Sequence, residues 1–336
     1  MKNVLITGGA GFIGSNFINY ILSQRDDFFI VNFDKLTYAG NLENLKPSEN
    51  NKNYLFIKGD IANAELINHI FEAYNIKYVI NFAAESHVDR SISGSQIFYT
   101  SNVIGTNVLL ETALKFKIKK FLQISTDEVY GSLGPKGLFT ESTPLSPNSP
   151  YSSSKAAADL MVLAFYHTYG LPVVITRCSN NYGPYQFPEK LIPLMVINSL
   201  NNKKLPVYGD GLNVRDWIYV TDHNKAAELV LEKGRVGEVY NVGASNEMSN
   251  IDIVKLILNQ LNKSEDLIQF VNDRLGHDKR YAIDSQKIRQ ELGWKPEFSF
   301  EDAIRKTINW YLENKSWWES IINGDYRNYY NNQYKF

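Results

Sequence analysis

The sequence predicts an α/β protein with a doubly wound parallel sheet, followed by a smaller α/β lobe toward the C-terminus. Short apolar runs alternate with helical patterns through the first half of the chain. Such alternation is typical of parallel strands that are joined by crossover helices. A glycine-rich turn directly follows the first apolar run, and the alternation loosens after about residue 180. These three observations indicate one large sheet and a second, less regular region.

The apolar runs of the first half predict buried strands, because each run is short and lies between polar or turn residues. The expected strands are Val4–Thr7, Phe29–Asp34, Tyr54–Lys58, Tyr78–Phe82, Lys120–Ser125 and Val173–Arg177. The segments between them have apolar residues at helical spacing. The expected helices are Ile13–Gln24, Ala64–Tyr74, Ile97–Lys115 and Ser152–Tyr169. This order predicts helices on both faces of the sheet.

The chain beyond residue 180 predicts shorter elements. Asn180–Pro188 is rich in Asn, Tyr, Gly and Pro, which favours a loop. The further expected strands and helices are Pro206–Tyr208, Asp216–Val220, Thr221–Lys233, Glu238–Val242, Asn250–Leu261, Asp284–Glu291 and Phe300–Asn314. We therefore predict a first domain over residues 1–180, a lobe over residues 181–324 and a tail over residues 325–336. The first boundary is soft, because late segments can return to the first domain. The Tyr- and Asn-rich tail is expected to be a surface extension, and we assign it no function.

The composition favours a soluble globular protein and argues against nucleic-acid and membrane partners. A hydrophobic content of 44% and a charged content of 21% are those of a soluble globular protein. The net charge of -1 provides no broad basic field, which argues against nucleic acid as the main partner. Cys178 is the only cysteine, so no intramolecular disulfide can form and a reducing compartment fits. No apolar run reaches the roughly 20 residues of a membrane helix, and no secretory signal is visible. We expect a cytoplasmic protein without a membrane partner.

The turn Thr7–Gly14 follows a strand and opens a helix, which is the context of a dinucleotide site. Its glycines allow a tight turn and close approach of a pyrophosphate, and the helix N-terminus favours the phosphate charge. Asp34 ends the second strand, where a carboxylate can bond the ribose hydroxyls and repel a 2′-phosphate. This arrangement favours NAD over NADP, although Lys35 leaves some room for NADP. The alternative to a dinucleotide site is a glycine turn with a purely structural role, together with an Asp that caps a helix.

Two later strand ends extend the expected cofactor site. Asp60 and Ile61 end the third strand, where the carboxylate can reach the adenine amino group. Its alternative role is an N-cap for helix Ala64–Tyr74. Ala83 and Ala84 end the fourth strand, and their small side chains let a cofactor approach the backbone.

Tyr151 is a candidate general base, and Lys155 is a candidate residue that assists it. They are four residues apart at the start of a helix, so both point from one face. Tyrosine acts as a base near neutral pH only if its pKa falls by roughly 3 units, which corresponds to about 4 kcal/mol. Lys155, an oxidised nicotinamide and the positive helix end all act in that direction. The alternative is an exposed Tyr and Lys without a catalytic role.

The triplet Thr126-Asp127-Glu128 adds a general acid and a general base, which are the catalytic groups needed for loss of water. On a hexose, Tyr151 would remove the C4 hydroxyl proton, and Thr126 would orient the C4 oxygen. Glu128 would remove the C5 proton as general base, and a protonated Asp127 would donate to the departing C6 hydroxyl. Adjacent carboxyls can differ in pKa because repulsion makes one hold its proton. Neighbouring strand residues point to opposite faces, so both acids can serve one sugar only if the strand ends near Thr126. A solvated loop is the alternative.

The glycine-rich turn together with Tyr151 and Lys155 resembles the extended short-chain dehydrogenase/reductase superfamily, which has a Rossmann sheet. Further motifs are similar to those of the dTDP-glucose 4,6-dehydratase family, over residues 7 to about 284. These motifs are Ala84–Ser91, Ser125–Gly131, Arg177–Tyr185, Phe187–Pro193, Val207–Gly211, Arg215–Trp217 and Asp273–Asp278. The Asp-Glu pair is the specific part, since the related UDP-galactose 4-epimerases carry small residues there. Small departures from the family pattern are Leu275, where many relatives have proline, and Ser101, where threonine is usual.

The resemblance implies an NAD-dependent dehydration of dTDP-glucose to the 4-keto-6-deoxy sugar nucleotide, for deoxysugar synthesis of the rhamnose type. It also implies a homodimer through helices 97–115 and 152–169, and no metal is expected. The cofactor-binding residues expected are Gly8, Gly11, Phe12, Ile13, Gly14, Asp34, Lys35, Leu36, Thr37, Asp60, Ile61, Ala83, Ala84, Ser86, Ser101, Tyr151, Lys155 and Asn180. The substrate-binding residues expected are Ser86, His87, Thr126, Asn181, Lys190, Leu191, Pro206, Val207, Tyr208, Arg215, Asn250, Asp273, Arg274 and His277. Arg215 and Arg274 are candidates for the diphosphate, because guanidinium groups match phosphate oxygens.

Other activities stay open at this point. The first alternative is a 4-epimerase, or a dehydratase that acts on a UDP or CDP sugar, and net release of water separates dehydratase from epimerase. The second is a noncatalytic NAD-sensing regulator, which has no need of Tyr151, Lys155, Asp127 and Glu128 together. The sequence does not decide between dTDP and UDP, because the choice of base depends on the shape of the pocket.

Overall fold

The computed structural model describes residues 1–322, 326, 330 and 333. Its main feature is a parallel sheet of seven described strands in the order β10-β6-β5-β4-β1-β2-β3. The strands are β1 Lys2–Thr7, β2 Phe28–Asp34, β3 Tyr54–Lys58, β4 Tyr78–Asn81, β5 Lys120–Thr126, β6 Val173–Cys178 and β10 Val239–Val242. The doubly wound sheet expected from the sequence is confirmed, and all six strands expected in the first half belong to it.

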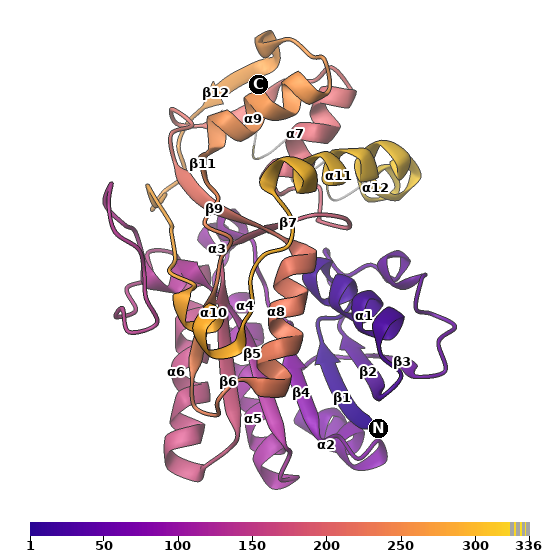
Figure 1. Cartoon of the computed structure of the whole chain (residues 1–336). Coiled ribbons are helices and arrows are strands. Elements are labelled where there is room, and N and C mark those ends of the chain that lie inside the picture. Colours follow the sequence, from indigo (N-terminus) through magenta and orange to yellow (C-terminus); the bar gives the residue numbers. More distant parts are fainter. Residues whose placement is uncertain (323–325, 327–329, 331–332, 334–336) are drawn as a thin grey trace.

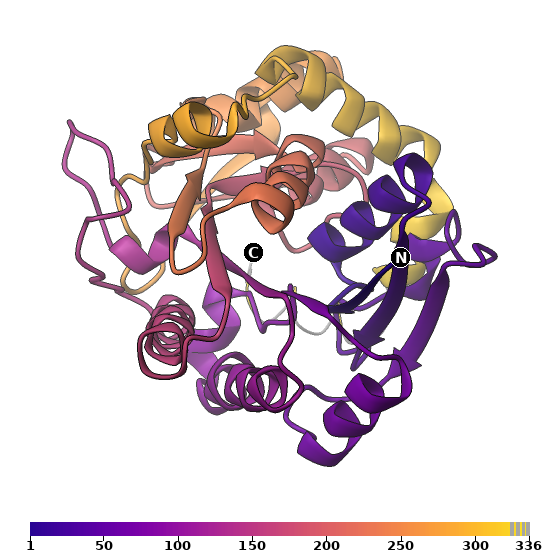
Figure 2. The same cartoon turned by 60° about the horizontal axis from the view of Figure 1, so that its bottom comes forward.

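Helices cover both faces of this sheet (Figure 2). On one face lie α1 Phe12–Gln24, α8 Val220–Lys233 and α10 Gln286–Leu292, and on the other lie α2 Ala64–Ala73, α5 Thr106–Lys115 and α6 Pro150–Tyr169. Alternate strand residues supply the two cores: Val4 and Ile6 pack toward α1 and α8, whereas Leu5 packs toward α2 and α5. Both faces are therefore apolar, as a covered parallel sheet requires.

Helix α6 begins at a well-defined cap. Ser149 accepts a hydrogen bond from the Ser152 backbone N–H, the Ser152 hydroxyl completes a capping box, and Pro150 occupies the first turn. The helix ends at Gly170, whose φ of 69° is the left-handed conformation favoured at a helix end. This cap fixes the start of the helix that carries Tyr151 and Lys155.

The expected helix 97–115 consists of three parts. They are α4 Gln96–Tyr99, a π-helical segment η2 Thr100–Gly105, and α5. Within η2 the Asn102 side chain accepts a hydrogen bond from the backbone N–H of Glu85 (2.9 Å) and donates to its carbonyl (3.0 Å). The π-helical segment is thereby tied to the loop that follows β4. Nothing in the sequence pattern had indicated this change of helix type.

The second half of the chain builds two small sheets and a separate apolar core. Their strands are β7 Asn180–Tyr182, β9 Val214–Tyr219 and β11 Glu247–Ser249 in one sheet, and β8 Leu205–Tyr208 and β12 Ile268–Val271 in the other. The helices are α7 Leu191–Leu200, α9 Asn250–Gln260, α11 Phe300–Glu313 and α12 Lys315–Ile321. Short elements elsewhere are α3 Val88–Ser93, η1 Leu42–Leu45, η3 Asp127–Tyr130 and η4 Glu265–Leu267. Figure 1 shows α7, α9 and α11 grouped at one end of the large sheet.

One sequence-based expectation for this half was wrong, and one helix was missed. The start of the expected loop 180–188 is strand β7, because it pairs with β9, a partner more than 30 residues away in the chain. Helix α7 was not expected at all, because its residues are almost all buried and apolar and show no one-sided pattern. In addition, α8, β10 and α10 return to the large sheet, so the chain crosses between the two regions more than once.

The described residues of the tail do not form a purely surface extension. Tyr326 is buried, and its hydroxyl donates to the carbonyl of Pro188 (3.2 Å). The Gln333 amide donates to the Tyr208 hydroxyl (2.7 Å). The rest of the expected tail lies outside the described residues, apart from Tyr330. Over the part of the chain that is described, no helix has the length and apolar character needed to cross a membrane.

Candidate active site

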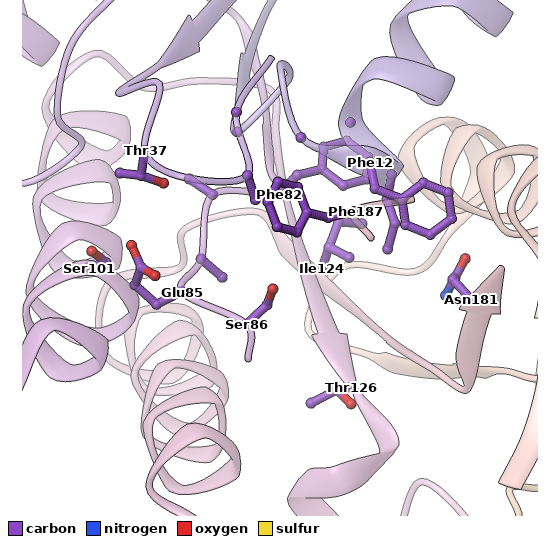
Figure 3. Close-up of a pocket in the computed structure, with 18 of the residues that line it drawn as sticks. Phe12, Thr37, Phe82, Glu85, Ser86, Ser101, Ile124, Thr126, Asn181 and Phe187 are labelled. Atoms are coloured by element: carbon purple, nitrogen blue, oxygen red, sulfur yellow. The ribbon is translucent and has the colours of Figure 1, made fainter. Parts of the chain in front are cut away.

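A cavity of about 300 Å³ lies at the carboxyl ends of the sheet strands, between the sheet and the smaller lobe (Figure 3). It is lined by every expected cofactor-binding residue except Leu36. Leu36 has a φ of 54°, and its backbone N–H donates to Asp34 Oδ1 (2.7 Å). Its side chain therefore does not line this cavity, and its contribution is to the position of Asp34.

The glycine-rich turn tolerates no larger residue at its key positions. Gly8 has a φ of 69°, and a Cβ on it would lie 2.6 Å from backbone atoms of Ala83. A Cβ on Gly14 would lie 2.5 Å from the carbonyl oxygen of Gly8. The turn thus brings β1, the start of α1 and the end of β4 into contact, and it leaves the N-terminus of α1 facing the cavity.

The charged side chains beside the expected ribose position, Asp34 and Lys35, each have partners within the protein. Asp34 is buried, and its carboxylate accepts hydrogen bonds from the backbone N–H groups of Ala10 (2.9 Å) and Leu36 (2.7 Å). Burial raises the pKa of Asp34, while these two amides act in the opposite direction. The Lys35 ammonium lies 2.7 Å from the carboxylate of Asp60. Lys35 is therefore already paired with an acid, which weakens the case for a 2′-phosphate.

Asp60 does not cap helix α2. That cap is Asn63, whose side chain accepts from the Leu66 backbone N–H (3.1 Å). Asp60 instead accepts from the backbone N–H of Ala62 (2.9 Å) and lines the cavity. The helix-cap alternative for Asp60 is thus wrong, and a role beside the cofactor stays a prediction.

The two candidate acids meet the geometric condition set by the sequence. Strand β5 ends at Thr126, and η3 begins at Asp127. Figure 3 shows Thr126 at that strand end. The Thr126 hydroxyl accepts from the Glu128 backbone N–H (3.3 Å), and all three residues line the same cavity. The turn removes the alternation of a strand, so Asp127 and Glu128 can serve one substrate. The solvated-loop alternative fails, because Asp127 is only 1% exposed.

Electrostatics separates the two acids. Burial raises the pKa of Asp127 well above its ordinary value, and the negative charges of Glu128 and Asp216 raise it further. Burial also raises the pKa of Glu128, but the positive charges of Arg215, Lys190 and Arg274 act against this. Glu128 is therefore the more readily ionised of the pair, and Asp127 the one that holds a proton. This order of pKa values is compatible with the expected division between general base and general acid, and the two roles stay predictions.

Tyr151 is buried at the same cavity, but its electrostatics differs from the expectation. Burial raises the pKa of Tyr151 well above its usual value, and the Glu128 charge adds to this, while a hydrogen bond with Thr126 acts against it. The Lys155 ammonium donates to the carbonyl of Ile124 (2.7 Å). Burial lowers the pKa of Lys155. Burial is the largest influence on the pKa of Tyr151, and the expected help from Lys155 stays a prediction.

A second cavity, of about 160 Å³, adjoins the first. Ser86, Glu128, Asn180, Glu189 and Lys190 line both cavities. The expected substrate-binding residues that line the second cavity are Ser86, His87, Lys190, Leu191, Pro206, Val207, Tyr208, Arg215, Asn250, Arg274 and His277. Thr126 and Asn181 line the first cavity instead. Glu128 therefore lies where the two spaces meet.

One expected substrate residue, Asp273, lines neither cavity. Its carboxylate accepts from the imidazole Nδ1 of His277 (2.5 Å), so it orients a lining residue from outside. His87 does line the second cavity. Burial, together with the cations Lys190, Arg274 and Arg90, lowers the pKa of His87 well below its ordinary value, so the imidazole is neutral.

The second cavity is lined by the three cations Lys190, Arg215 and Arg274, together with the acids Glu128, Glu189 and Asp278. The Arg215 guanidinium lies 4.2 Å from the centroid of the Tyr281 ring and donates to the carbonyl of Asp278 (2.9 Å). Arg274 lies over Tyr208 at 4.6 Å. Lys190 lines the same space, and its ammonium donates to the carbonyl of Ser86 (2.9 Å). Together, Arg215, Arg274 and Lys190 suit an anion such as a diphosphate in a protein of net charge -1.

Sequence reasoning missed a buried acid between the cavities. Glu189 is 6% exposed and accepts two hydrogen bonds from Arg90, each of 3.1 Å. Arg90 in turn lies 3.9 Å from the ring centroid of Tyr38, which lines the first cavity. A signal was available, because Glu189 lies within the motif Phe187–Pro193 and next to the expected substrate residue Lys190. Among the described residues, no group of three or more His, Cys, Asp or Glu side chains is arranged to hold a metal ion.

Comparison with known proteins agrees with this geometry. The family model described as GDP-mannose 4,6 dehydratase matches residues 5–307. A probable dTDP-glucose 4,6-dehydratase from Sinorhizobium fredii is 53% identical over 95% of both chains. The dTDP-glucose 4,6-dehydratase from Escherichia coli is 49% identical over 96% of this chain and 97% of its own. The chain belongs to the dTDP-glucose 4,6-dehydratase family.

Solved structures show the same similarity. The dTDP-glucose 4,6-dehydratase from Bacillus anthracis, in complex with NAD, has a TM-score of 0.90 and 55% identity, over 96% of this chain and 100% of its own. The enzyme of that name from Streptomyces venezuelae, with NAD bound, has a TM-score of 0.92 and 47% identity, over 95% and 99% of the two chains. A UDP-glucose 4-epimerase from Thermotoga maritima is more distant, with 30% identity and a TM-score of 0.87 over 93% and 99%.

Replacement of Asp127 by Asn should stabilise the protein at neutral pH. The folded-state pKa of Asp127 is raised above its unfolded value, so this group favours folding most at low pH. That contribution is lost as the pH rises above the unfolded pKa of about 3.9. We therefore expect the difference in Tm between Asp127→Asn and the parent protein to increase from about pH 5 to about pH 8. The exposed Asp26→Asn variant is the control, and a difference that does not change with pH would contradict the assignment.

Proposed function

We propose that the protein converts dTDP-glucose to dTDP-4-keto-6-deoxyglucose and water, with NAD as a cofactor that is regenerated in each cycle. The observation that carries this proposal is the position of the acid pair. Asp127 and Glu128 share a cavity with Tyr151, and Glu128 also faces the second cavity, which is lined by Arg215, Arg274 and Lys190. One sugar can then lie beside all three side chains, with its diphosphate toward Arg215, Arg274 and Lys190.

The first cavity fits NAD. The glycine-rich turn leaves room for a pyrophosphate at the N-terminus of α1, and Asp34 provides a carboxylate for the ribose hydroxyls. Ser101 and Asn180 line the nearby parts of the cavity and would complete the cofactor site. When bound, NAD accepts a hydride from C4 of the sugar and returns a hydride at C6.

In the oxidation, Tyr151 removes the proton of the C4 hydroxyl, and Thr126 bonds the C4 oxygen. Burial raises the pKa of Tyr151, and the Glu128 charge raises it further. We therefore expect this proton transfer only when cofactor and substrate are both in place. Lys155, which is held by the carbonyl of Ile124, would bond the nicotinamide ribose from the same helix face.

In the elimination, the 4-ketone acidifies the C5 proton, and Glu128 removes it. Asp127 donates a proton to the C6 hydroxyl, which leaves as water. A proton then returns to C5 when the double bond between C5 and C6 is reduced. The sum is the loss of one water from the sugar without net oxidation. A 4-epimerase has no step that requires these two acids, whereas this reaction uses both.

We propose a dTDP sugar and not a UDP or CDP sugar as the substrate, because the relatives reported above are described as dTDP-glucose 4,6-dehydratases. Val207 and Tyr208 line the second cavity where the base and ribose would lie. A cytoplasmic location and a place in deoxysugar synthesis of the rhamnose type complete the proposal. A noncatalytic regulator would leave the buried acids without a purpose, although burying them destabilises the fold.

A homodimer is part of the same proposal. The interface would consist of α4, η2 and α5 together with α6, which lie side by side on one face of the sheet. These helices keep large apolar side chains exposed, including Ile104 at 54% and Leu160 at 59%. Exposed apolar side chains gathered on neighbouring helices are typical of a protein interface.

The function is tested by mass spectrometry of the purified protein incubated with dTDP-glucose and without added NAD. We expect a product lighter by one water, which also shows that the cofactor is retained and recycled. A product of unchanged mass with inverted C4 would instead establish an epimerase. If dTDP-glucose is not converted, the same assay with UDP-glucose and CDP-glucose, and then with added NAD, decides between another sugar nucleotide and a protein without this activity.

The double variant Asp127→Asn, Glu128→Gln should separate the two halves of the reaction. We expect it to reduce bound NAD at C4 in a single turnover, because Tyr151 is intact, and to lose water elimination by at least about 10²-fold. Absorbance of the reduced nicotinamide follows the first step and mass spectrometry the second. The matched control is Asp266→Asn, Glu265→Gln on the exposed turn η4. Normal dehydration by the double variant would remove both acids from the mechanism.

The double variant Ile104→Glu, Leu160→Glu should dissociate the expected dimer. Two charges would be placed in the proposed apolar interface, where their desolvation is unfavourable. Analytical ultracentrifugation should show a dimer for the parent protein and a monomer for this variant. Leu212 is also exposed, at 61%, but lies outside these helices, so Leu212→Glu should remain dimeric. A parent protein that sediments as a monomer would refute the dimer.

A further inference from the structure

The catalytic side chains belong to two groups that are attached to the fold by different contacts. Thr126, Tyr151 and Lys155 form the oxidation group. Helix α6, which carries Tyr151 and Lys155, is fastened directly to strand β5, because the Lys155 ammonium donates to the carbonyl of Ile124 (2.7 Å). Thr126 ends that strand and hydrogen-bonds Tyr151. This group is thus held together by contacts between α6 and β5, and α6 also packs on η3 through Ala156.

Asp127 and Glu128 form the elimination group, and their local contacts are weak. The Thr126 hydroxyl lies 3.4 Å from Asp127 Oδ1 and 3.3 Å from the Glu128 backbone N–H, which are long for hydrogen bonds. The last residue of the same turn is Tyr130, which is only 2% exposed. Tyr130 supplies side-chain hydrogen bonds that tie η3 to the rest of the fold.

Tyr130 is bonded to a buried ion pair behind the site. Arg177 on β6 donates from Nη1 to the Tyr130 hydroxyl (3.0 Å) and from Nε to Asp159 Oδ2 (2.8 Å) on α6. The side chains of Arg177 and Asp159 are 4% and 0% exposed. The Tyr130 hydroxyl in turn donates to Asn241 Oδ1 (2.8 Å) on β10. Burial raises the pKa of Tyr130 to about 12, so the hydroxyl keeps the proton for this bond.

The ring of Tyr130 is held as firmly as its hydroxyl. The Arg177 guanidinium lies 4.9 Å from the ring centroid, and the Phe139 ring stacks on the tyrosine ring at 5.0 Å. Asp159 lies one helical turn after Lys155 and two turns after Tyr151, on the same face of α6. The Arg177 guanidinium therefore joins the helix that carries Tyr151 to the turn that carries Asp127 and Glu128, in addition to the direct packing of α6 on η3.

We propose that Tyr130 and Arg177 are positioning residues that hold the acids of η3 in register with Tyr151, so that elimination of water follows oxidation at C4. Neither residue lines the two cavities, so they act through the turn and not on the substrate. A displacement of about 1 Å at a catalytic group can reduce a rate by up to about 10²-fold. Because Lys155 fastens α6 to β5 independently, loss of the Tyr130 contact should displace the acids and leave Tyr151 in place. This inference rests on the proposed dehydration.

The test compares the two chemical steps in Tyr130→Phe. This variant keeps the ring and its stacking but removes the hydroxyl that Arg177 and Asn241 share. In single-turnover stopped-flow mixing with dTDP-glucose, we expect reduced nicotinamide to form at a rate within about twofold of the parent rate. Its disappearance should slow by about tenfold. Mass spectrometry of quenched samples should show the 4-keto sugar before loss of water, lighter than the substrate by two hydrogen atoms.

Arg177→Lys provides a second variant, because lysine keeps the charge beside Asp159 but cannot bridge to Tyr130 in the same fork geometry. It should show the same selective slowing of the second phase. Tyr169→Phe, at an exposed position of α6, should behave like the parent protein in both phases. Tm is measured for every variant, and exchange of the C5 proton with deuterated solvent gives an independent measure of the Glu128 step.

The outcomes separate the inference from the proposed function. If the parent protein does not dehydrate dTDP-glucose, the proposed function is wrong, whatever the variants do. If the parent protein dehydrates and Tyr130→Phe slows neither phase, the positioning role is wrong. Equal slowing of both phases with a lower Tm would also overturn it, because that is the result of a purely structural role. Selective slowing of the second phase supports the inference.

Discussion

The end of strand β5 at Thr126 is the constraint on which the rest of the site depends. In a continuing strand, Asp127 and Glu128 would point to opposite faces of the sheet. The change to η3 at this residue directs both side chains to the cavity at the carboxyl ends of the strands. It also places them beside Tyr151, which α6 brings to the same edge of the sheet. The local backbone of a few residues thus decides whether the sheet can support oxidation alone or oxidation with elimination.

The main sheet and the cofactor cavity could be predicted from sequence because their signals are local. Each of these signals can be recognised from a few neighbouring residues: the short apolar runs, the glycine turn and Asp34. The parallel arrangement of the strands follows from their alternation with helices. Asp60 could be placed at a strand end, but its neighbour Asn63 had to be seen as the actual helix cap. The position of a residue was therefore easier to predict than its hydrogen-bond partner.

What could not be predicted depends on contacts between distant segments. Strand β7 forms because it pairs with β9, and Glu189 is buried because Arg90, nearly 100 residues earlier, neutralises it. The all-round apolar character of α7 gave no periodic signal, since the helix is buried on most sides. Asp273 was expected at the substrate because it belongs to a motif, yet it faces His277 from outside the cavity. The functional roles of the cavity residues stay predictions.

Burial connects the stability of the site to its chemistry. The same low exposure raises the pKa values of Asp127 and Tyr151 and lowers that of Lys155, so each group is held toward its neutral form. For Asp127 this is the form that a general acid needs, and the chain provides it unaided. For Tyr151 it is the opposite of what a base needs, so its activation must depend on the bound reactants. With the roles proposed above, the acid Asp127 is ready before substrate binds and the base Tyr151 only afterwards. In the proposed reaction, proton removal at C4 is then restricted to the complete complex, in which Asp127 and Glu128 are already in place.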